Sequence, residues 1–284
     1  IYRNADQTDK IHAAIEKLAS GETSYKVDVN DFSSLEAELA EGLNRISDGL
    51  ETALAEQVKS ERLKADLITN VSHDIKTPLT SIINYVDLIK RQHIEDPTVQ
   101  KYLEVLDQKS QRLKTLTEDL VEASRASSGN IKLEITNIDF VELVQQTTGE
   151  FEEKYAIRHL EIVNTLPNEV IMIEADGRRL WRVLENLYNN AFKYALEGTR
   201  VYVTIEDHGA DVVFTIKNVS ANPLNISPDE LTERFVRGDV SRTTEGSGLG
   251  LSIAKDLTTL QGGKFELIID GDLFKAQITF PIKN

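Results

Sequence analysis

An apolar stripe with helical spacing runs through residues 67–89 and restricts the fold more than any other pattern in the chain. Its members are three or four residues apart: Leu67, Val71, Ile75, Leu79, Ile82, Val86 and Ile89. This spacing predicts an amphipathic helix that ends near Arg91. A second helix is expected next, with Asp96 as N-cap and Pro97 in its first turn. Its apolar face carries Val99, Leu103, Leu106, Leu113, Leu116 and Leu120. One antiparallel hairpin leaves apolar surface uncovered, so we expect two hairpins to pair as a homodimeric four-helix bundle.

His73 lies off this stripe, in the string VSHDIKTPL at residues 71–79. At about 100° per residue, Thr77 follows His73 on the same solvent-facing side. Pro78 lacks an N–H for the carbonyl of Asp74, so we expect the helix to bend there and expose the imidazole. A neutral imidazole is nucleophilic near pH 7, and Asp74 can accept the proton that it releases. The string therefore predicts a phosphoacceptor site, and a solvated helix face is the alternative.

The composition of the 284 residues excludes several classes of protein. A formal net charge of −15 argues against direct binding to nucleic acid or anionic lipid. The chain has no cysteine, which excludes disulfides and thiolate metal sites. No apolar run approaches the ~20 residues that span a bilayer, and no signal peptide is visible, so we expect the chain as given to be soluble.

Residues 1–57 have the pattern of a helix, a connector and a second helix. A short amphipathic segment at residues 6–18 precedes the polar stretch SGETS (20–24) and the extended stretch YKVDV (25–29). The second helix opens near residues 31–34. Its heptad-like apolar positions are Leu35, Leu39, Leu43, Ile46, Leu50 and Leu54. This layout resembles a HAMP signal-transfer module, and a plain coiled-coil stalk with the same repeat is the alternative.

Beyond residues 126–130 the pattern changes to mixed α and β. Strands are expected at residues 131–135, 201–205, 212–216, 265–269 and 274–280, the last four as two hairpins. Helices are expected at residues 140–155, 178–195 and 251–260. The predicted fold is therefore multidomain, with a helical coiled coil and a dimeric four-helix bundle followed by an α/β sandwich.

Two polar patterns in this second half suit a nucleotide. The helix at residues 178–195 has one polar face, formed by Arg182, Asn186, Asn190 and Lys193. Carboxamides and a lysine suit Mg²⁺ and phosphates, and a solvated helix face is the alternative. In the string GSGLGLS at residues 246–252, the glycines let backbone N–H groups approach phosphate oxygens. We interpret this string as a flexible nucleotide lid.

The order of these motifs resembles the H, N, F and G2 boxes of bacterial sensor histidine kinases. The matching stretches are the His73 string, ENLYNNAFKY (185–194), ERFVRGD (233–239) and GSGLG (246–250). The resemblance implies three domains. They are a HAMP-like module at 1–57, a dimerisation and histidine phosphotransfer hairpin at 58–126, and a catalytic ATP-binding domain at 127–284.

The resemblance also implies an activity. His73 would accept the γ-phosphoryl group of ATP with Asp74 as its base, and would pass it to a response-regulator receiver domain. Thr77 would orient a water against the phospho-aspartate of that regulator, and a helix-face hydroxyl without a role is the alternative. Because HAMP modules follow a membrane span, we expect this chain to be the cytoplasmic portion of a membrane receptor.

The implied ATP site draws on all the other motifs. Asn190 would bind Mg²⁺, Asn186 and Lys193 would contact phosphates, and Tyr194 would line the adenine pocket. Phe235 would anchor the lid and Arg237 and Arg242 would balance phosphate charge. The lid that closes over ATP would be formed by Gly246, Gly248, Leu249 and Gly250.

One stretch departs from the family pattern. Where the family's G1 box has Asp-x-Gly-x-Gly, this chain has NVSAN at residues 218–222. The Asn218 oxygen can accept the hydrogen bond of the adenine amino group, but without the charge that strengthens it. Weaker ATP binding, or a protein that binds nucleotide without activity, is the alternative.

Two other classes of protein explain less of the chain. A Hsp90- or gyrase-type ATPase places a water-activating glutamate where this chain has Asn186. A coiled-coil adaptor would leave the ENLYNNAFKY stretch and the glycine-rich lid without a role.

Overall fold

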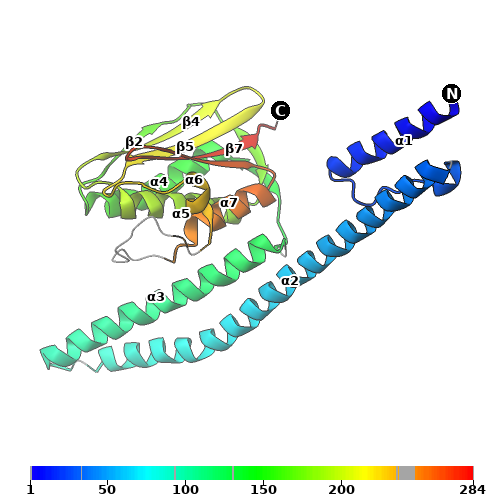
Figure 1. Ribbon diagram of the computed structural model, residues 1–284. Coiled ribbons are helices and arrows are strands. Elements are labelled where there is room, and N and C mark those ends of the chain that lie inside the picture. Colours follow the sequence, from blue (N-terminus) through cyan, green and yellow to red (C-terminus); the bar gives the residue numbers. More distant parts are fainter. Residues whose placement is uncertain are drawn as a thin grey trace. The chain divides into compact units, whose positions relative to one another are not determined.

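The computed structural model describes residues 2–32, 34–92, 94–129, 131–234, 236 and 247–283. The chain divides into two compact units, Ile1–Asp66 and Leu67–Asn284, and helix α2 (Ser34–Lys90) belongs to both (Figure 1). No helix within these ranges combines the length and the hydropathy needed to span a membrane.

The first unit contains helix α1 (Tyr2–Ala19), a connector with the short 3-10 helix η1 (Val29–Asp31), and the beginning of α2. Asn44 of α2 holds the connector, because its side chain pairs with both the N–H and the carbonyl of Val27 at 2.9 Å. Ala14, Val27 and Ala40 are buried together. The predicted order of helix, connector and helix is confirmed, and the assignment to a HAMP module stays a prediction.

The second unit begins with a hairpin of α2 and α3 (Pro97–Ser127). The Asp96 side chain accepts a hydrogen bond from the Thr98 N–H at 2.8 Å, which caps α3 as predicted. The seam between the two helices is formed by buried side chains seven residues apart, namely Ser72, Leu79 and Val86 of α2 and Leu103, Ser110, Thr117 and Ser124 of α3.

Only part of the predicted apolar stripe lies in this seam. The following members remain 38 to 65% exposed: Leu67, Val71, Ile75, Ile82 and Ile89. The stripe therefore forms two faces, one against α3 and one that the single chain leaves uncovered.

The rest of the second unit is an α/β sandwich. The main sheet has the strand order β2-β4-β5-β7-β6, with β2 parallel to β4 and the other neighbours antiparallel. Its strands are β2 (Glu161–Thr165), β4 (Arg200–Asp207), β5 (Asp211–Val219), β7 (Leu273–Pro281) and β6 (Lys264–Asp270). Two short strands, β1 (Thr136–Asp139) and β3 (Met172–Ala175), pair separately. The hairpins β4–β5 and β6–β7 are confirmed.

Three helices cover one face of this sheet (Figure 1). They are α4 (Phe140–Ala156), α5 (Gly177–Tyr194) and α7 (Gly250–Leu260), and the short helix α6 (Pro228–Thr232) precedes α7. The core between helices and sheet contains Phe140, Tyr155, Tyr188, Phe214 and Phe280, all fully buried. The Tyr155 hydroxyl donates to the Tyr188 carbonyl at 2.7 Å, which fixes α5 on α4.

The prediction of a strand at residues 131–135 is wrong. The chain there has no regular secondary structure, and β1 begins only at Thr136. The reason lies in the Glu134 N–H, which donates to the Asp176 carboxylate at 3.0 Å rather than to a neighbouring strand. The same carboxylate caps α5 by accepting from the Arg179 N–H at 3.1 Å.

Asp176 gives a testable pH dependence. Burial alone would raise its pKa, but the N–H groups of Glu134 and Arg179 and the Arg179 charge lower it below the ordinary value. A carboxylate whose pKa is lowered by folding stabilises the fold at pH values above its pKa in the unfolded chain. This stabilisation is lost as the pH falls through its pKa in the folded chain. We expect Asp176→Asn to lower the free energy of unfolding by about 1–2 kcal/mol at pH 7, and by progressively less as the pH falls below about 4. Thermal denaturation across this pH range measures the loss of stability, with the exposed Asp211→Asn as the control. A loss in Asp176→Asn that stays constant with pH would contradict the lowered pKa of Asp176.

Candidate functional site

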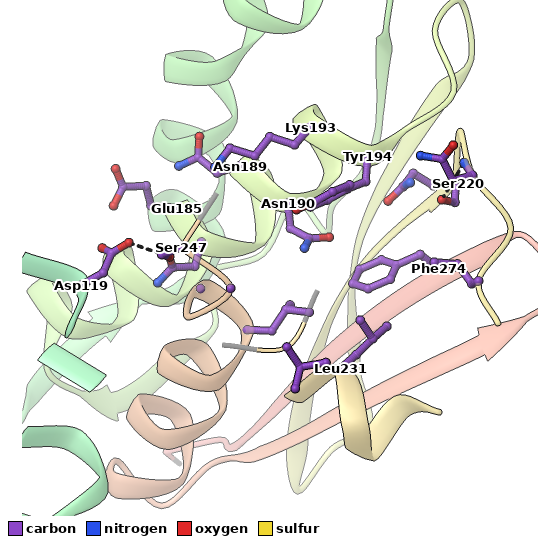
Figure 2. A pocket seen from close by; sticks show the side chains of 18 of the residues that line it. Asp119, Glu185, Asn189, Asn190, Lys193, Tyr194, Ser220, Leu231, Ser247 and Phe274 are labelled. Carbon is purple, nitrogen blue, oxygen red and sulfur yellow. Dashed lines mark hydrogen bonds between the residues drawn. The ribbon is translucent and has the colours of Figure 1, made fainter. Parts of the chain in front are cut away.

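A cavity of about 360 Å³ lies beside the polar face of α5. Its walls include apolar side chains from several elements, which are Leu224, Leu231, Leu251 and Phe274. Figure 2 shows Phe274 and Ser220 toward one end of the cavity and Asp119, Glu185 and Ser247 toward the other. An apolar end and a polar end suit a ligand that has a flat apolar part and a charged part.

The polar face of α5 forms one wall of the cavity. Asn186, Asn190, Lys193 and Tyr194 all line the cavity. On the opposite side of the helix, Leu180, Leu184, Leu187 and Ala191 are fully buried in the core. The helix is therefore fixed by its apolar face, and its carboxamides are held at the cavity.

Two buried polar atoms at the cavity, one on α5 and one on β5, have no hydrogen-bond partner among the described residues. They are Nδ2 of Asn186 and Oδ1 of Asn218. Asn218 is 2% exposed, and its Nδ2 donates to the Val219 carbonyl at 3.2 Å, which leaves Oδ1 as a free acceptor. An unpaired buried polar group costs about 1–3 kcal/mol, so a ligand that pairs with both atoms is favoured.

The glycine-rich segment lies against the same wall of the cavity. Gly248 lines the cavity with a φ of 70°, which favours glycine. A Cβ on Gly250 would lie 3.3 Å from Oδ1 of Asn186, so a larger residue would press on that carboxamide. Leu249 is buried, and α7 begins at Gly250 with its positive N-terminal dipole at the cavity. Phe235, Arg237, Arg242 and Gly246 lie outside the described residues.

Sequence reasoning missed Lys154 of α4. Its Nζ donates to Oδ1 of Asn189 at 2.6 Å, lies over the rings of Phe151 and Phe192, and borders the cavity. Burial lowers the pKa of Lys154, while the Glu185 carboxylate opposes this shift. Lys154 and Asn189 are 35 residues apart, and no local pattern in the sequence connects them.

His73 does not line this cavity. Its side chain is 80% exposed on α2, which stays helical through Pro78. His73 Nδ1 lies 3.7 Å from Oδ1 of Asp74, and the Thr77 hydroxyl lies 3.5 Å from the His73 carbonyl. The predicted neighbours are therefore together and accessible. A separate cavity of about 410 Å³ borders His73, with Lys76, Lys114 and Arg125 among its cations.

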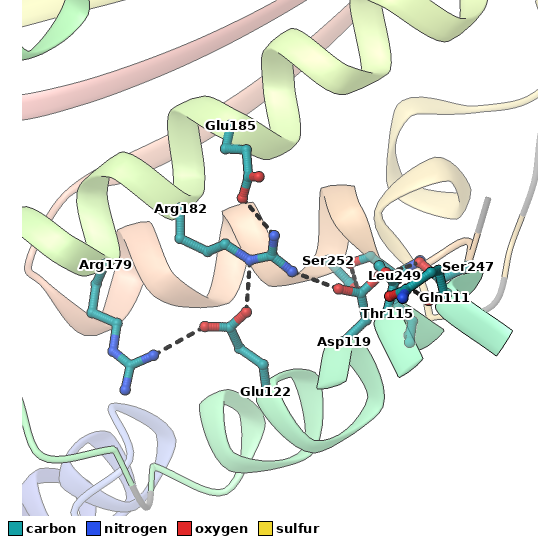
Figure 3. A network of polar contacts seen from close by, with 10 residues as sticks. All are labelled: Gln111, Thr115, Asp119, Glu122, Arg179, Arg182, Glu185, Ser247, Leu249 and Ser252. Atoms are coloured by element: carbon teal, nitrogen blue, oxygen red, sulfur yellow. Dashed lines mark hydrogen bonds and ion pairs between the residues drawn. The ribbon is translucent and has the colours of Figure 1, made fainter. Parts of the chain in front are cut away.

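A network of charges joins α3 to α5 (Figure 3). Arg182 contacts three carboxylates, those of Asp119, Glu122 (2.8 Å) and Glu185 (2.5 Å). Arg179 contacts Glu122 at 3.0 Å. Burial alone would lower the pKa of Arg182, but its hydrogen bonds to Glu185 and Glu122 raise it above its ordinary value. The sequence placed Arg182 on the polar face but gave no sign of its partners on α3.

Comparison with known proteins identifies both functional parts. Residues 63–129 match the His Kinase A (phospho-acceptor) domain. Residues 175–283 match the family described as histidine kinase-, DNA gyrase B- and HSP90-like ATPase. The first match contains His73, and the second contains the polar face of α5, Asn218 and the glycine-rich segment.

Curated relatives are similar to this chain over most of its length. Sensor histidine kinase WalK of Bacillus subtilis is 28% identical over 237 residues, 81% of this chain and 39% of the relative. Sensor histidine kinase MtrB of Mycobacterium tuberculosis is 29% identical over 257 residues, 88% of this chain and 44% of the relative. The chain thus spans less than half the length of these relatives.

Solved structures support the fold. Full-length ShkA in complex with AMPPNP has a TM-score of 0.66 at 23% identity, covering 77% of this chain and 46% of that chain. Histidine kinase ThkA in complex with response regulator protein TrrA has a TM-score of 0.55 at 23% identity, covering 82% and 67%. With a phosphoacceptor domain and an ATP-binding domain in this order, the chain belongs to the bacterial sensor histidine kinases.

Proposed function

We propose that this chain phosphorylates itself on His73 with ATP and transfers the phosphoryl group to an aspartate of a response-regulator receiver domain. The observation that carries the proposal is the cavity at α5, with its two unpartnered buried carboxamide atoms, in a chain that also exposes His73. We further propose that the chain is the signalling part of a membrane sensor.

The cavity fits ATP through named atoms. Oδ1 of Asn218 would accept from the adenine amino group, and Nδ2 of Asn186 and the Lys193 ammonium would donate to phosphate oxygens. Among the described residues, no group of three or more His, Cys, Asp or Glu could hold a metal ion. Mg²⁺ would therefore be held by phosphate oxygens together with the Asn190 carboxamide, and it would neutralise phosphate charge.

His73 would provide the nucleophile. Asp74 lies on the Nδ1 side of the imidazole, so Nε2 is available to attack the γ-phosphorus. The N–P bond forms as the bond from that phosphorus to the bridging oxygen breaks, and ADP leaves with the electron pair. Asp74 would accept the Nδ1 proton and balance the charge that develops on the ring. Lys76, Lys114 and Arg125 border the same cavity as His73 and suit an anionic phosphoryl group.

We also propose that the chain acts as a homodimer. The uncovered apolar face of α2 continues on α3, where Leu106 is 50% and Leu113 is 46% exposed. A second hairpin would cover this face and remove its apolar area from water.

The direct test is incubation of the chain with γ-labelled ATP and Mg²⁺. We expect a label on the protein that is labile in acid and stable in base, as a phosphoramidate is. A chain without such a label, under conditions in which it binds ATP, would reject the kinase activity.

Thr77 would support hydrolysis of the phosphorylated regulator. Its hydroxyl is exposed one turn beyond His73 and can orient a water against a phospho-aspartate. We expect Thr77→Ala to slow dephosphorylation of the regulator at least about tenfold while His73 still accepts phosphate. Loss of label from purified phospho-regulator measures this rate. Exposed Thr80→Ala, one turn further on, is the control, and equal rates for wild type and Thr77→Ala would remove the role.

A further inference from the structure

Helix α3 contributes directly to the nucleotide cavity. Thr115 and Asp119 line it together with Asn186 and Asn190 of α5. In Figure 2, Asp119 and Ser247 lie at the polar end, away from Phe274 and Ser220. The end of the cavity that suits phosphates is therefore partly built by the helical hairpin.

The Asp119 carboxylate is held at this end from two sides. One oxygen accepts from Arg182, and the other accepts from the Ser247 hydroxyl at 2.9 Å. The side chain is only 11% exposed, so water screens its charge weakly. The carboxylate thereby connects the hairpin to α5 and to the glycine-rich segment.

The two arginines of this network are already neutralised by carboxylates. Arg182 and Arg179 are surrounded by the carboxylates of Asp119, Glu122 and Glu185 (Figure 3). Three negative charges against two positive charges leave the network with one negative charge. A terminal phosphate at this end would meet the Asp119 carboxylate instead of a free guanidinium.

We propose that Asp119 makes the site discriminate between nucleotides by the length of the phosphate chain. This rests on the nucleotide site proposed above. While α3 is docked through Arg182, the cavity accepts a nucleoside diphosphate. The terminal phosphate of a triphosphate has to displace Asp119, which releases Arg182 and Ser247 from the hairpin. Because such coupling is reciprocal, ATP weakens the docking of α3 by the factor by which docking weakens ATP.

Calorimetric titration of the whole chain with ADP and with a non-hydrolysable ATP analogue, both with Mg²⁺, tests the proposal. Asp119→Asn removes the charge and keeps the size of the side chain. We expect it to tighten binding of the analogue about tenfold and to change binding of ADP less than about twofold. The matched control is Asp107→Asn on the same helix, whose carboxylate contacts Lys90 at 2.7 Å within the hairpin. It should alter neither affinity.

A second variant separates docking from direct repulsion. Glu122 contacts both arginines but does not itself line the nucleotide cavity, so Glu122→Gln weakens docking and leaves the Asp119 carboxylate in place at that cavity. We expect it to tighten analogue binding by about two- to fivefold, with ADP unchanged. An unchanged analogue affinity in this variant would overturn the link to docking.

Two other results of the titrations would reject the inference, each for a different reason. Equal changes for ADP and the analogue in Asp119→Asn, or weaker binding of the analogue, would overturn the discrimination. If no chain, Asp119→Asn included, binds either nucleotide, the nucleotide site itself is rejected, and this inference with it.

Discussion

His73→Gln should abolish phosphorylation of the chain by ATP, with labelling reduced at least about 100-fold. Glutamine keeps much of the polarity and size of histidine but has no ring nitrogen that can form an N–P bond. The side chain is 80% exposed, so its replacement removes little packing from the fold. Labelling with γ-labelled ATP, quantified beside ATP affinity, measures the loss. The affinity should be unchanged, because His73 does not line the cavity beside α5 that is proposed to hold ATP.

His208 provides a matched control for this experiment. It is also exposed and beside a carboxylate, with Nε2 at 3.3 Å from Oε2 of Glu206, but it lies in the turn between β4 and β5. His208→Gln should therefore retain the wild-type label. Full labelling of His73→Gln, or a label that is stable in acid, would show that another residue is the acceptor.

Local patterns were sufficient to predict most of the elements. The cap at Asp96, the polar face of α5 and the two β-hairpins are each encoded within a few residues of sequence. The strand expected at 131–135 failed because a distant side chain, Asp176, takes the Glu134 N–H. The spacing of the apolar stripe predicts one face of α2, but only its side chains seven residues apart are buried toward α3, and the others stay exposed.

The charged wall of the site could not be predicted in this way. Arg182 and Asp119 are 63 residues apart, and Ser247 and Asp119 are 128 apart. Each is an ordinary polar residue on its own segment, and only the packing of α3 against α5 and α7 makes them partners. Asn218 is the opposite case. Its departure from the family's aspartate was visible in the sequence, but its free oxygen became apparent only once its amide was seen bonded to Val219.

Asn218→Leu should weaken ATP binding about 10- to 100-fold. Leucine has the same number and branching of side-chain heavy atoms as asparagine, with a larger volume, and residue 218 is 2% exposed, so the substitution keeps the outline of the side chain while the acceptor disappears. The adenine amino group would then be buried without a partner, which costs about 1–3 kcal/mol. Guanine has a carbonyl where adenine has its amino group and gains nothing from this acceptor. The affinity for GTP should therefore change less than about threefold, and the preference for ATP should be lost.

Competition against a fluorescent ADP analogue measures both affinities. Asn164→Leu is the matched control, because Asn164 is an exposed asparagine on β2 outside the cavity. A parallel loss of ATP and GTP binding would mean that residue 218 supports the wall of the cavity and does not read the base. Unchanged ATP binding would mean that the base lies elsewhere in the cavity. The altered NVSAN stretch would then mark a different mode of nucleotide binding, in which the Asn218 oxygen stays unpaired and the contacts of Asn186 and Lys193 with phosphates supply the affinity.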